Sequence, residues 1–181
     1  MATRGAIVRA TGTNSFAGAY HHWDSYPTSL GSTLWNLYHE RYKKDLDAML
    51  KELIDDHPAG WSTINDADWN QSPGYTEYKD TTETEEKQRP QCYCHGDRRE
   101  SANVVTEKTA ANVGCEYVYA FGEENERPYM LILSSYVGER KMIGMFGMGD
   151  PDATWHILAK IMLNSEEPDW SKIEQKETDS E

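Results

Sequence analysis

The stretch Tyr20-His21-His22-Trp23-Asp24-Ser25-Tyr26-Pro27 lies between two parts of the chain that have different periodicity. Residues 4–23 read as two β-type runs around the turn residues 11–15, which predicts a hairpin. Beyond the octet, apolar residues recur at helical spacing from residue 34 to about 54, which predicts one long amphipathic helix. Pro27 breaks the strand, so the octet marks the change from strand to helix.

Regular pattern returns in the last third of the chain. Three runs predict a β-meander: residues 114–121, 129–136 and 141–148. Apolar spacing at about 153–163 predicts a second helix. The expected fold class is therefore α+β: an antiparallel sheet of about five strands, formed by the N-terminal hairpin and the C-terminal meander, with two helices packed on one face.

Other segments lack such patterns. We predict an ordered loop at 61–74, held by its tryptophans, and a mobile polar insertion at about 76–100. The last residues, 165–181, are acidic and are predicted to form a disordered tail, with a helical turn around Trp170 and Ile173 as the alternative. The rest of the chain, 1–164, is predicted to be a single α+β domain, as suits a length of 181 residues.

The composition limits the class of partner. With 31 acidic and 18 basic residues, the formal net charge is −13, which argues against binding to nucleic-acid backbone or to an anionic membrane. No apolar run reaches the ~20 residues of a membrane span, and the start lacks the apolar region of a signal peptide. The odd number of cysteines predicts reduced thiols in a cytoplasm. The expected partner is a protein or a small-molecule ligand.

The octet holds the residues that predict a site. Because strand side chains alternate, Tyr20 and His22 share one face and Trp23 lies on the other. An imidazole beside a carboxylate is the minimal general-base pair, so the candidate catalytic residues are His22, Asp24 and Arg4. The same side chains would also suit a binding surface, and the predicted binding residues are Tyr20, His22, Trp23, Asp24, Tyr26 and Trp61.

A third, structural interpretation of the octet, in which its side chains only stabilise the fold, stays open beside the catalytic and the binding interpretations. In it, Trp23 and Tyr26 pack on the long helix, Asp24 caps a turn, and His22 bonds a backbone carbonyl. The alternation separates two faces but does not say which of them is a site and which is core.

The pattern resembles that of small uncharacterised proteins found in bacteriophages, prophages and some bacteria. These open with a short Met-x-Thr-Arg strand and continue with Tyr-x-His-Trp-Asp-Gly-Tyr-Pro, a glycine and a helix. The residues that match here are Thr3, Arg4, Tyr20, His22, Trp23, Asp24, Tyr26, Pro27 and Gly31. The family's glycine before the second tyrosine is Ser25, whose Cβ makes a turn with φ above 0° harder to adopt. The resemblance covers about residues 1–35 and implies a phage-like class of protein, with no established activity.

A second group of candidate residues comprises Cys92, Cys94, His95 and Cys115. Three thiols and one imidazole would complete a tetrahedral zinc site. The spacing argues against this, because paired zinc ligands favour two to four intervening residues, and Cys92 and Cys94 have only Tyr93 between them. The preferred interpretation is free thiols, so no cofactor is predicted and zinc is the alternative.

Three functional hypotheses follow. The first is a phage-like, soluble, cytoplasmic binding or accessory protein that engages its partner through the aromatic residues of the octet. The second is a small hydrolase or nucleotide-processing enzyme that uses His22 and Asp24. The third is an acidic DNA mimic that inhibits a nucleic-acid enzyme, which requires acidic residues spaced along ordered elements. A non-enzymatic role is the preferred one.

Overall fold

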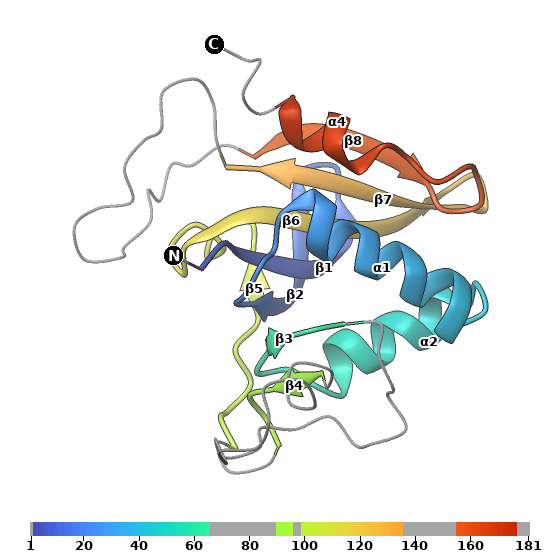
Figure 1. Cartoon of the computed structure of the whole chain (residues 1–181). Helices are drawn as coiled ribbons and strands as arrows, with labels where there is room; N and C mark the ends of the chain where they lie inside the picture. The colour runs from blue at the N-terminus through green and yellow to red at the C-terminus, as the bar shows by residue number, and fades with distance from the viewer. Residues whose placement is uncertain (1, 66–89, 96–98, 136–154, 177–181) are drawn as a thin grey trace, which may run out of the picture.

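The computed structural model describes residues 2–65, 90–95, 99–135 and 155–176 (Figure 1). In this part of the chain, eight strands form one open sheet in the order β4-β3-β2-β1-β6-β7-β8, and β5 pairs with β2. Most pairs are antiparallel, but β1 runs parallel to β6 and β2 runs parallel to β3. The fold is thus the expected mixture of helices with a mostly antiparallel sheet, and it has more strands than the five predicted.

The predicted N-terminal hairpin is confirmed by β1 (Arg4–Gly12) and β2 (Ser15–His21), which pair in antiparallel fashion. Strand alternation places Ile7 on the face that the helices cover and Ala6 and Val8 on the opposite face, and all three are fully buried. A strand that is buried on both faces belongs in the centre of a sheet, and β1 lies there, between β2 and β6.

The C-terminal strands are β6 (Cys115–Glu124), β7 (Arg127–Ser134) and β8 (His156–Met162). The first two confirm two strands of the predicted meander. The third predicted strand, at 141–148, lies outside the described residues. The meander is instead continued by β8, so the prediction of a helix at 153–163 is wrong.

The reason for this error is the shortness of β8. Its apolar residues recur three or four positions apart, which fits a helix, but seven residues are too few for periodicity to separate helix from strand. Pairing with β7, from Tyr129 opposite Met162 to Ser134 opposite His156, satisfies the backbone of this segment as a strand. The strand that decides between helix and strand here is β7, which lies some thirty positions earlier in the chain.

The predicted long helix is two helices. The first is continuous through η1 (Pro27–Gly31), α1 (Ser32–Asn36) and η2 (Leu37–Arg41). The second is continuous through α2 (Leu46–Leu50) and η3 (Lys51–Asp55).

The break between the two helices has a local cause. Lys43 and Lys44 adopt positive φ values of 49° and 67°, which no helix interior accepts. Asp45 then begins the second helix, since its carboxylate accepts a hydrogen bond of 3.0 Å from the backbone N–H of Ala48. Lysine pairs and an aspartate are common on exposed helix surfaces, so this turn was not predicted.

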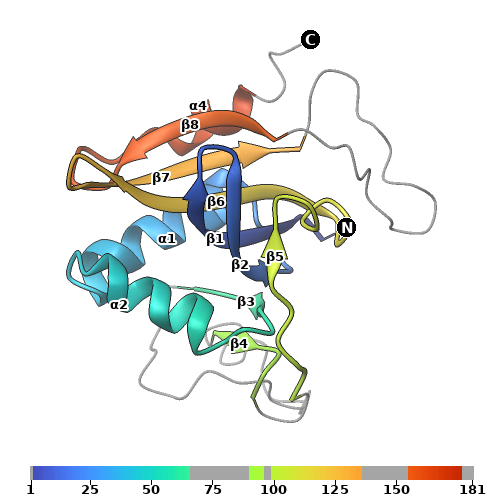
Figure 2. The same ribbon diagram turned by 180° about the vertical axis from the view of Figure 1, so that it is seen from behind.

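The apolar stripe that predicted a helix continues across the break. All of its members are buried in one core against the sheet: Leu34, Leu37, Tyr38, Tyr42, Leu46, Met49, Leu50 and Leu53. Figure 2, seen from behind, shows α1 behind the sheet, and residues of both helices share one core cluster with Ile7 and Tyr119 of the sheet. The second helix on this face is thus α2 and not the one predicted at 153–163. No helix in the described ranges is long and apolar enough to cross a membrane.

Three short strands lie in the middle of the chain: β3 (Trp61–Thr63) in the predicted loop, β4 (Gln91–Cys92) in the predicted insertion, and β5 (Val105–Thr106) just after it. Residues 66–89, which hold most of the predicted insertion, lie outside the described residues. Gly60 brings the chain from the second helix to β3, with a φ of 90°, and a Cβ there would lie 2.6 Å from the carbonyl oxygen of Tyr20. Glycine is needed at this position for both its conformation and its closeness to β2.

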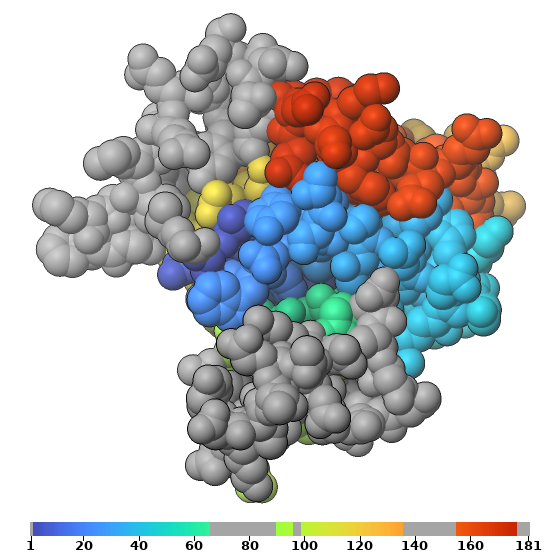
Figure 3. Space-filling view, viewed as in Figure 1, coloured from blue at the N-terminus to red at the C-terminus, as the bar shows by residue number. Residues whose placement is uncertain are grey.

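The end of the described chain is ordered, which corrects the predicted disordered tail as far as residue 176. Helix α4 (Trp170–Gln175) buries Ile173 in the core on the helix side of the sheet. The Trp170 ring packs edge-on to Trp35, with 6.4 Å between the ring centroids. Figure 3 shows the resulting continuous surface of the first helix with the C-terminal segment. Two apolar residues among acids were enough to dock this segment.

Candidate functional site

The octet lies in a loop that is held on both sides. At its start, the backbone N–H groups of His22 and Trp23 donate to the carbonyls of Trp61 and Ser62, at 3.0 and 3.2 Å. Further on, the N–H of Ser25 donates to Thr3. Pro27 is then the first residue of the first helix, where a missing backbone N–H costs nothing.

The buried polar residues of the octet are His21 and Ser25. The backbone N–H of Ile64 donates to Nε2 of His21, at 3.2 Å, so the proton of the neutral ring lies on Nδ1. That Nδ1–H donates to Oγ of Ser25, at 2.8 Å, and the hydroxyl in turn donates to the carbonyl of His21. Both ring nitrogens of His21 are therefore occupied by hydrogen bonds that hold the fold. Because Nδ1 donates to Ser25, it cannot accept the proton of the serine hydroxyl, and the two residues do not form a nucleophile and its base.

The burial of His21 makes stability depend on pH. Burial, and then the charge of neighbouring His22, lowers the pKa of His21 to about 3 from the ordinary 6.5. Below pH 6.5 the unfolded chain takes up a proton that the folded chain refuses, so stability is lost as the pH falls from 6.5 towards 3. We expect the neutral His21 to lower the free energy of unfolding by about 2 kcal/mol when the pH falls from 6.5 to 5.

Urea unfolding at several pH values measures this effect. His21→Asn keeps a polar group near the position of Nδ1 but cannot titrate, so its stability should fall less steeply with acid than that of the wild type. Equal slopes for the two proteins would contradict a buried, neutral His21.

The turn of the octet is made by Asp24, which has a φ of 55°. Aspartate tolerates this left-handed region better than most residues. The neighbouring Ser25 is fully buried, and its carbonyl accepts a 2.6 Å hydrogen bond from the hydroxyl of Tyr119. Its Cβ also occupies the space that the absent Cβ of Gly5 leaves free. Serine at this position therefore does not prevent a left-handed turn, because the positive φ lies one residue earlier.

Four rings form what we call the aromatic surface: Tyr20, His22, Trp23 and Tyr93. The hydroxyl of Tyr20 lies 2.7 Å from Nδ1 of His22, and the His22 ring meets Trp23 at 84° with 4.7 Å between centroids. Tyr93 stacks on Tyr20 at 6.4 Å. Trp23 is 49% exposed, so it does not pack in the core against the helix, as the structural interpretation of the octet had it.

The predicted catalytic residues are arranged differently from a general-base pair. Nδ1 of His22 is bonded to Tyr20, and the carboxylate of Asp24 is bonded to Tyr26. Burial, and then the charge of Asp24, raises the pKa of Tyr26. Arg4 lies against Gly114, where an added Cβ would be 2.9 Å from its Nη1.

The prediction of Trp61 as a binding residue is wrong. It lies in β3 with no exposed surface, and its Nε1–H donates to the carbonyl of Leu53 at 2.8 Å. That carbonyl belongs to the last turn of the second helix, where no helical partner remains for it. Trp61 therefore both fills the core and caps a helix.

Of the predicted metal ligands, Cys92, Cys94 and His95 come together, and His57 joins them. One potential ligand atom from each of the four lies within 4.8 Å of the others. Cys115 takes no part in this cluster. It is buried in the core on the opposite face of the sheet, where its thiol donates to the carbonyl of Gly5.

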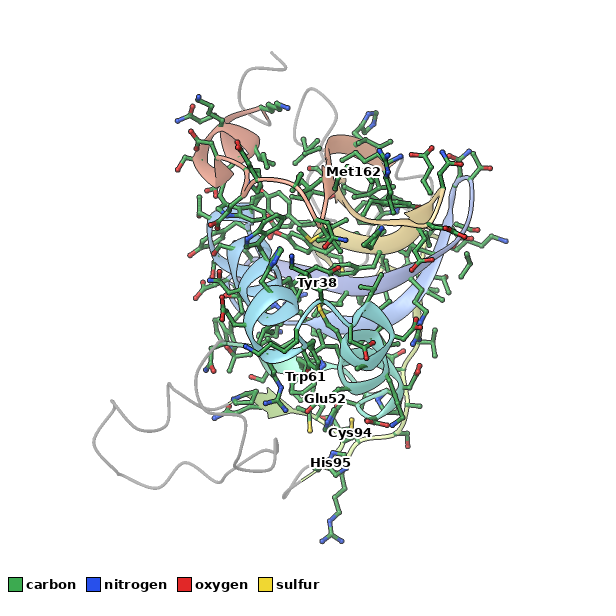
Figure 4. The ribbon with its side chains drawn as sticks, turned by 90° about the vertical axis from the view of Figure 1, so that its right-hand side faces the viewer. Tyr38, Glu52, Trp61, Cys94, His95 and Met162 are labelled. Carbon is green, nitrogen blue, oxygen red and sulfur yellow. The ribbon has the colours of Figure 1, made fainter. Side chains whose placement is uncertain are left out.

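The Cys–His cluster is built from two segments. His57 follows the second helix directly, and Cys92, Cys94 and His95 belong to β4 and the bend after it. In Figure 4, Cys94 and His95 lie beyond Trp61 and Glu52, at the end of the molecule where β4 is the edge strand. The sequence carries no local signal for His57, because it precedes Cys92 by 35 positions (92 − 57) and stands alone at a helix end.

Comparison with protein-family models, with curated proteins and with solved structures found no match. The resemblance of the octet to a family of phage-type proteins therefore stays a prediction. The residues of the site are interpreted from their geometry and chemistry alone.

Proposed function

We propose that this chain is a binding protein that holds a basic segment of a partner protein against the aromatic surface. The observation that supports this most is the half-exposed Trp23. Tryptophan is enriched among the residues that dominate binding energy at protein interfaces, and this ring is 49% exposed.

The support beneath Trp23 favours binding over a chance exposure. His22 contacts the tryptophan ring edge-on and is itself held by the hydroxyl of Tyr20, while Tyr93 stacks behind Tyr20. A ring that is already positioned loses little conformational entropy when a partner binds. The surface is therefore preorganised without being covered.

The charge beside Trp23 suggests the chemistry of the partner. Asp24 is exposed, and both Asp24 and Glu174 act electrostatically on neighbouring Tyr26. A lysine or arginine of a partner would interact with the face of the tryptophan and with these carboxylates together. The net charge of −13 would also attract a basic segment from a distance.

Trp23→Ala should weaken binding of a basic peptide at least about tenfold and leave the fold intact, because the ring is exposed and contributes little to the core. Peptides for the test can be selected from a displayed random library on the wild-type protein, and we expect the selected sequences to be rich in lysine and arginine. Affinities are then compared by calorimetry, and folding by circular dichroism.

Ile157→Ala is the matched control, since Ile157 is 65% exposed on β8 and is not part of the aromatic surface. It should bind the selected peptides as the wild type does. Selected peptides that bind Trp23→Ala with undiminished affinity would refute the proposal. The DNA-mimic hypothesis also expects a basic partner, but only the proposed function makes Trp23 necessary.

The enzyme hypothesis receives less support from the geometry. It needs Asp24 to orient His22, whereas the hydrogen bonds given above join His22 to Tyr20 and Asp24 to Tyr26. A polar hollow of about 420 Å³ lies beside Tyr38 and Lys44. It is at the other end of the first helix from the octet, so the candidate catalytic residues do not line it.

A further inference from the structure

We propose that His57, Cys92, Cys94 and His95 bind one zinc ion in a closed structural site. None of these four residues belongs to the aromatic surface, and the inference does not rest on the proposed function. It differs from the ligand set that the sequence offered as an alternative to free thiols, in which Cys115 held the place that His57 takes here.

The spacing of the donor atoms fits a metal ion. Zinc binds sulfur at about 2.3 Å and imidazole nitrogen at about 2.0–2.1 Å, so the ligand atoms of a tetrahedral site lie about 3.3–3.8 Å from one another. The four potential donors here all lie within 4.8 Å of one another, and Sγ of Cys92 is already 3.3 Å from Nδ1 of His95. Movements of about 1 Å or less by side chains would complete the shell.

His57 supplies an independent indication of a ligand. Its side chain is buried, and Nδ1 has no hydrogen-bond partner among the described residues. A buried polar atom without a partner is costly, and a metal ion bound through this nitrogen would satisfy it. Metals bind the neutral form of an imidazole.

The backbone around the two thiols is arranged to support sulfur ligands. The N–H of Ala59 donates to Sγ of Cys94 at 3.3 Å, and Sγ of Cys92 accepts from the backbone N–H groups of Cys94 and His95. Hydrogen bonds of this kind orient metal-bound sulfur and stabilise its negative charge. Burial opposes these hydrogen bonds, because it disfavours the thiolate and raises the pKa of Cys92.

The identity of the ligands favours zinc. Two thiolates and two neutral imidazoles are a common structural zinc set, and their charge of about −2 balances that of Zn²⁺ in a largely buried place. Because four protein side chains fill a tetrahedral shell, no position is left for water or substrate. The site is therefore structural rather than catalytic.

The ion would add to the few contacts that join β4 to the end of the second helix. Strand β4 has two residues, and among the described strands it pairs with β3, which has three. The zinc would connect β4 to His57 at the end of the second helix. It would also fix Tyr93, which lies between two ligands, donates its N–H to the carbonyl of Gly60 and stacks on Tyr20 of the aromatic surface.

Cobalt substitution tests the proposal directly. Protein purified with reduced thiols should carry one zinc per chain by mass spectrometry of the metal. After chelation, added Co²⁺ should produce the absorption bands of a tetrahedral site and of sulfur-to-cobalt charge transfer, and Zn²⁺ should abolish them. A protein that binds no metal when zinc is in excess, or whose thiols form a disulfide in the cell, would overturn the proposal.

Variants identify the ligands. Cys94→Ser and His95→Ala should weaken Co²⁺ binding by more than the roughly 10- to 100-fold that loss of an outer-shell partner costs. His95 is exposed, so its truncation leaves the core intact even if Cys94→Ser misfolds. Cys115→Ser is the matched control, because this thiol lies in the other core, and it should retain full Co²⁺ binding. Equal loss of binding in Cys115→Ser and His95→Ala would contradict the proposed ligand set.

Discussion

Trp61→Ala should lower the free energy of unfolding by about 4 kcal/mol, the largest effect that we expect from a single substitution in the described residues. The side chain has no exposed surface, so its removal forfeits the burial of a large ring and leaves a cavity between β3 and the second helix. It also removes the donor that satisfies the carbonyl of Leu53 at a helix end, which adds the cost of an unpaired buried acceptor. Urea unfolding followed by far-UV circular dichroism measures the change.

Two control variants separate the causes. Trp61→Phe keeps most of the ring but loses the Nε1–H, and should cost about 1–3 kcal/mol, less than the alanine variant. Trp23→Ala removes an equally large side chain from the exposed octet, and should cost less than about 1 kcal/mol. A loss as large in Trp23→Ala as in Trp61→Ala would contradict the division between an exposed and a buried tryptophan.

Removal of the proposed zinc should lower the free energy of unfolding by about 3 kcal/mol when free zinc is about 100 times its dissociation constant. The ion would stabilise the folded chain because its four ligands converge only there, whereas in the unfolded chain His57 and Cys92 are 35 positions apart. A strand as short as β4 cannot hold this closure by its own backbone hydrogen bonds.

Thermal unfolding with and without a chelator measures this effect. The midpoint should fall on chelation and return when zinc is added in excess. His95→Ala should unfold near the temperature of the chelated wild type and respond little to either reagent, while Cys115→Ser should respond as the wild type does. A midpoint that is unchanged by chelation of a protein shown to contain zinc would mean that the ion does not stabilise the fold.

The sequence by itself determined the elements whose pattern is local. Alternation predicted the N-terminal hairpin and two strands of the meander, and helical spacing identified the buried stripe from Leu34 to Leu53. Local chemistry also identified the octet as the junction between strand and helix, and brought Cys92, Cys94 and His95 forward as metal ligands. In each case the information lies within a few neighbouring residues, because periodicity reports which side of an element faces the core.

Only the tertiary structure decided the features that depend on distant partners. A neighbouring strand made residues 156–162 a strand rather than a helix, and packing on the first helix ordered the acidic segment around Ile173. The same holds at the site, where Trp61 proved to be core and Trp23 surface, and where His57 and not Cys115 lies close to the side chains of Cys92, Cys94 and His95. Hydrogen-bond partners, burial and ligand geometry are properties of contacts between residues that are far apart in the chain, and local spacing carries no record of them.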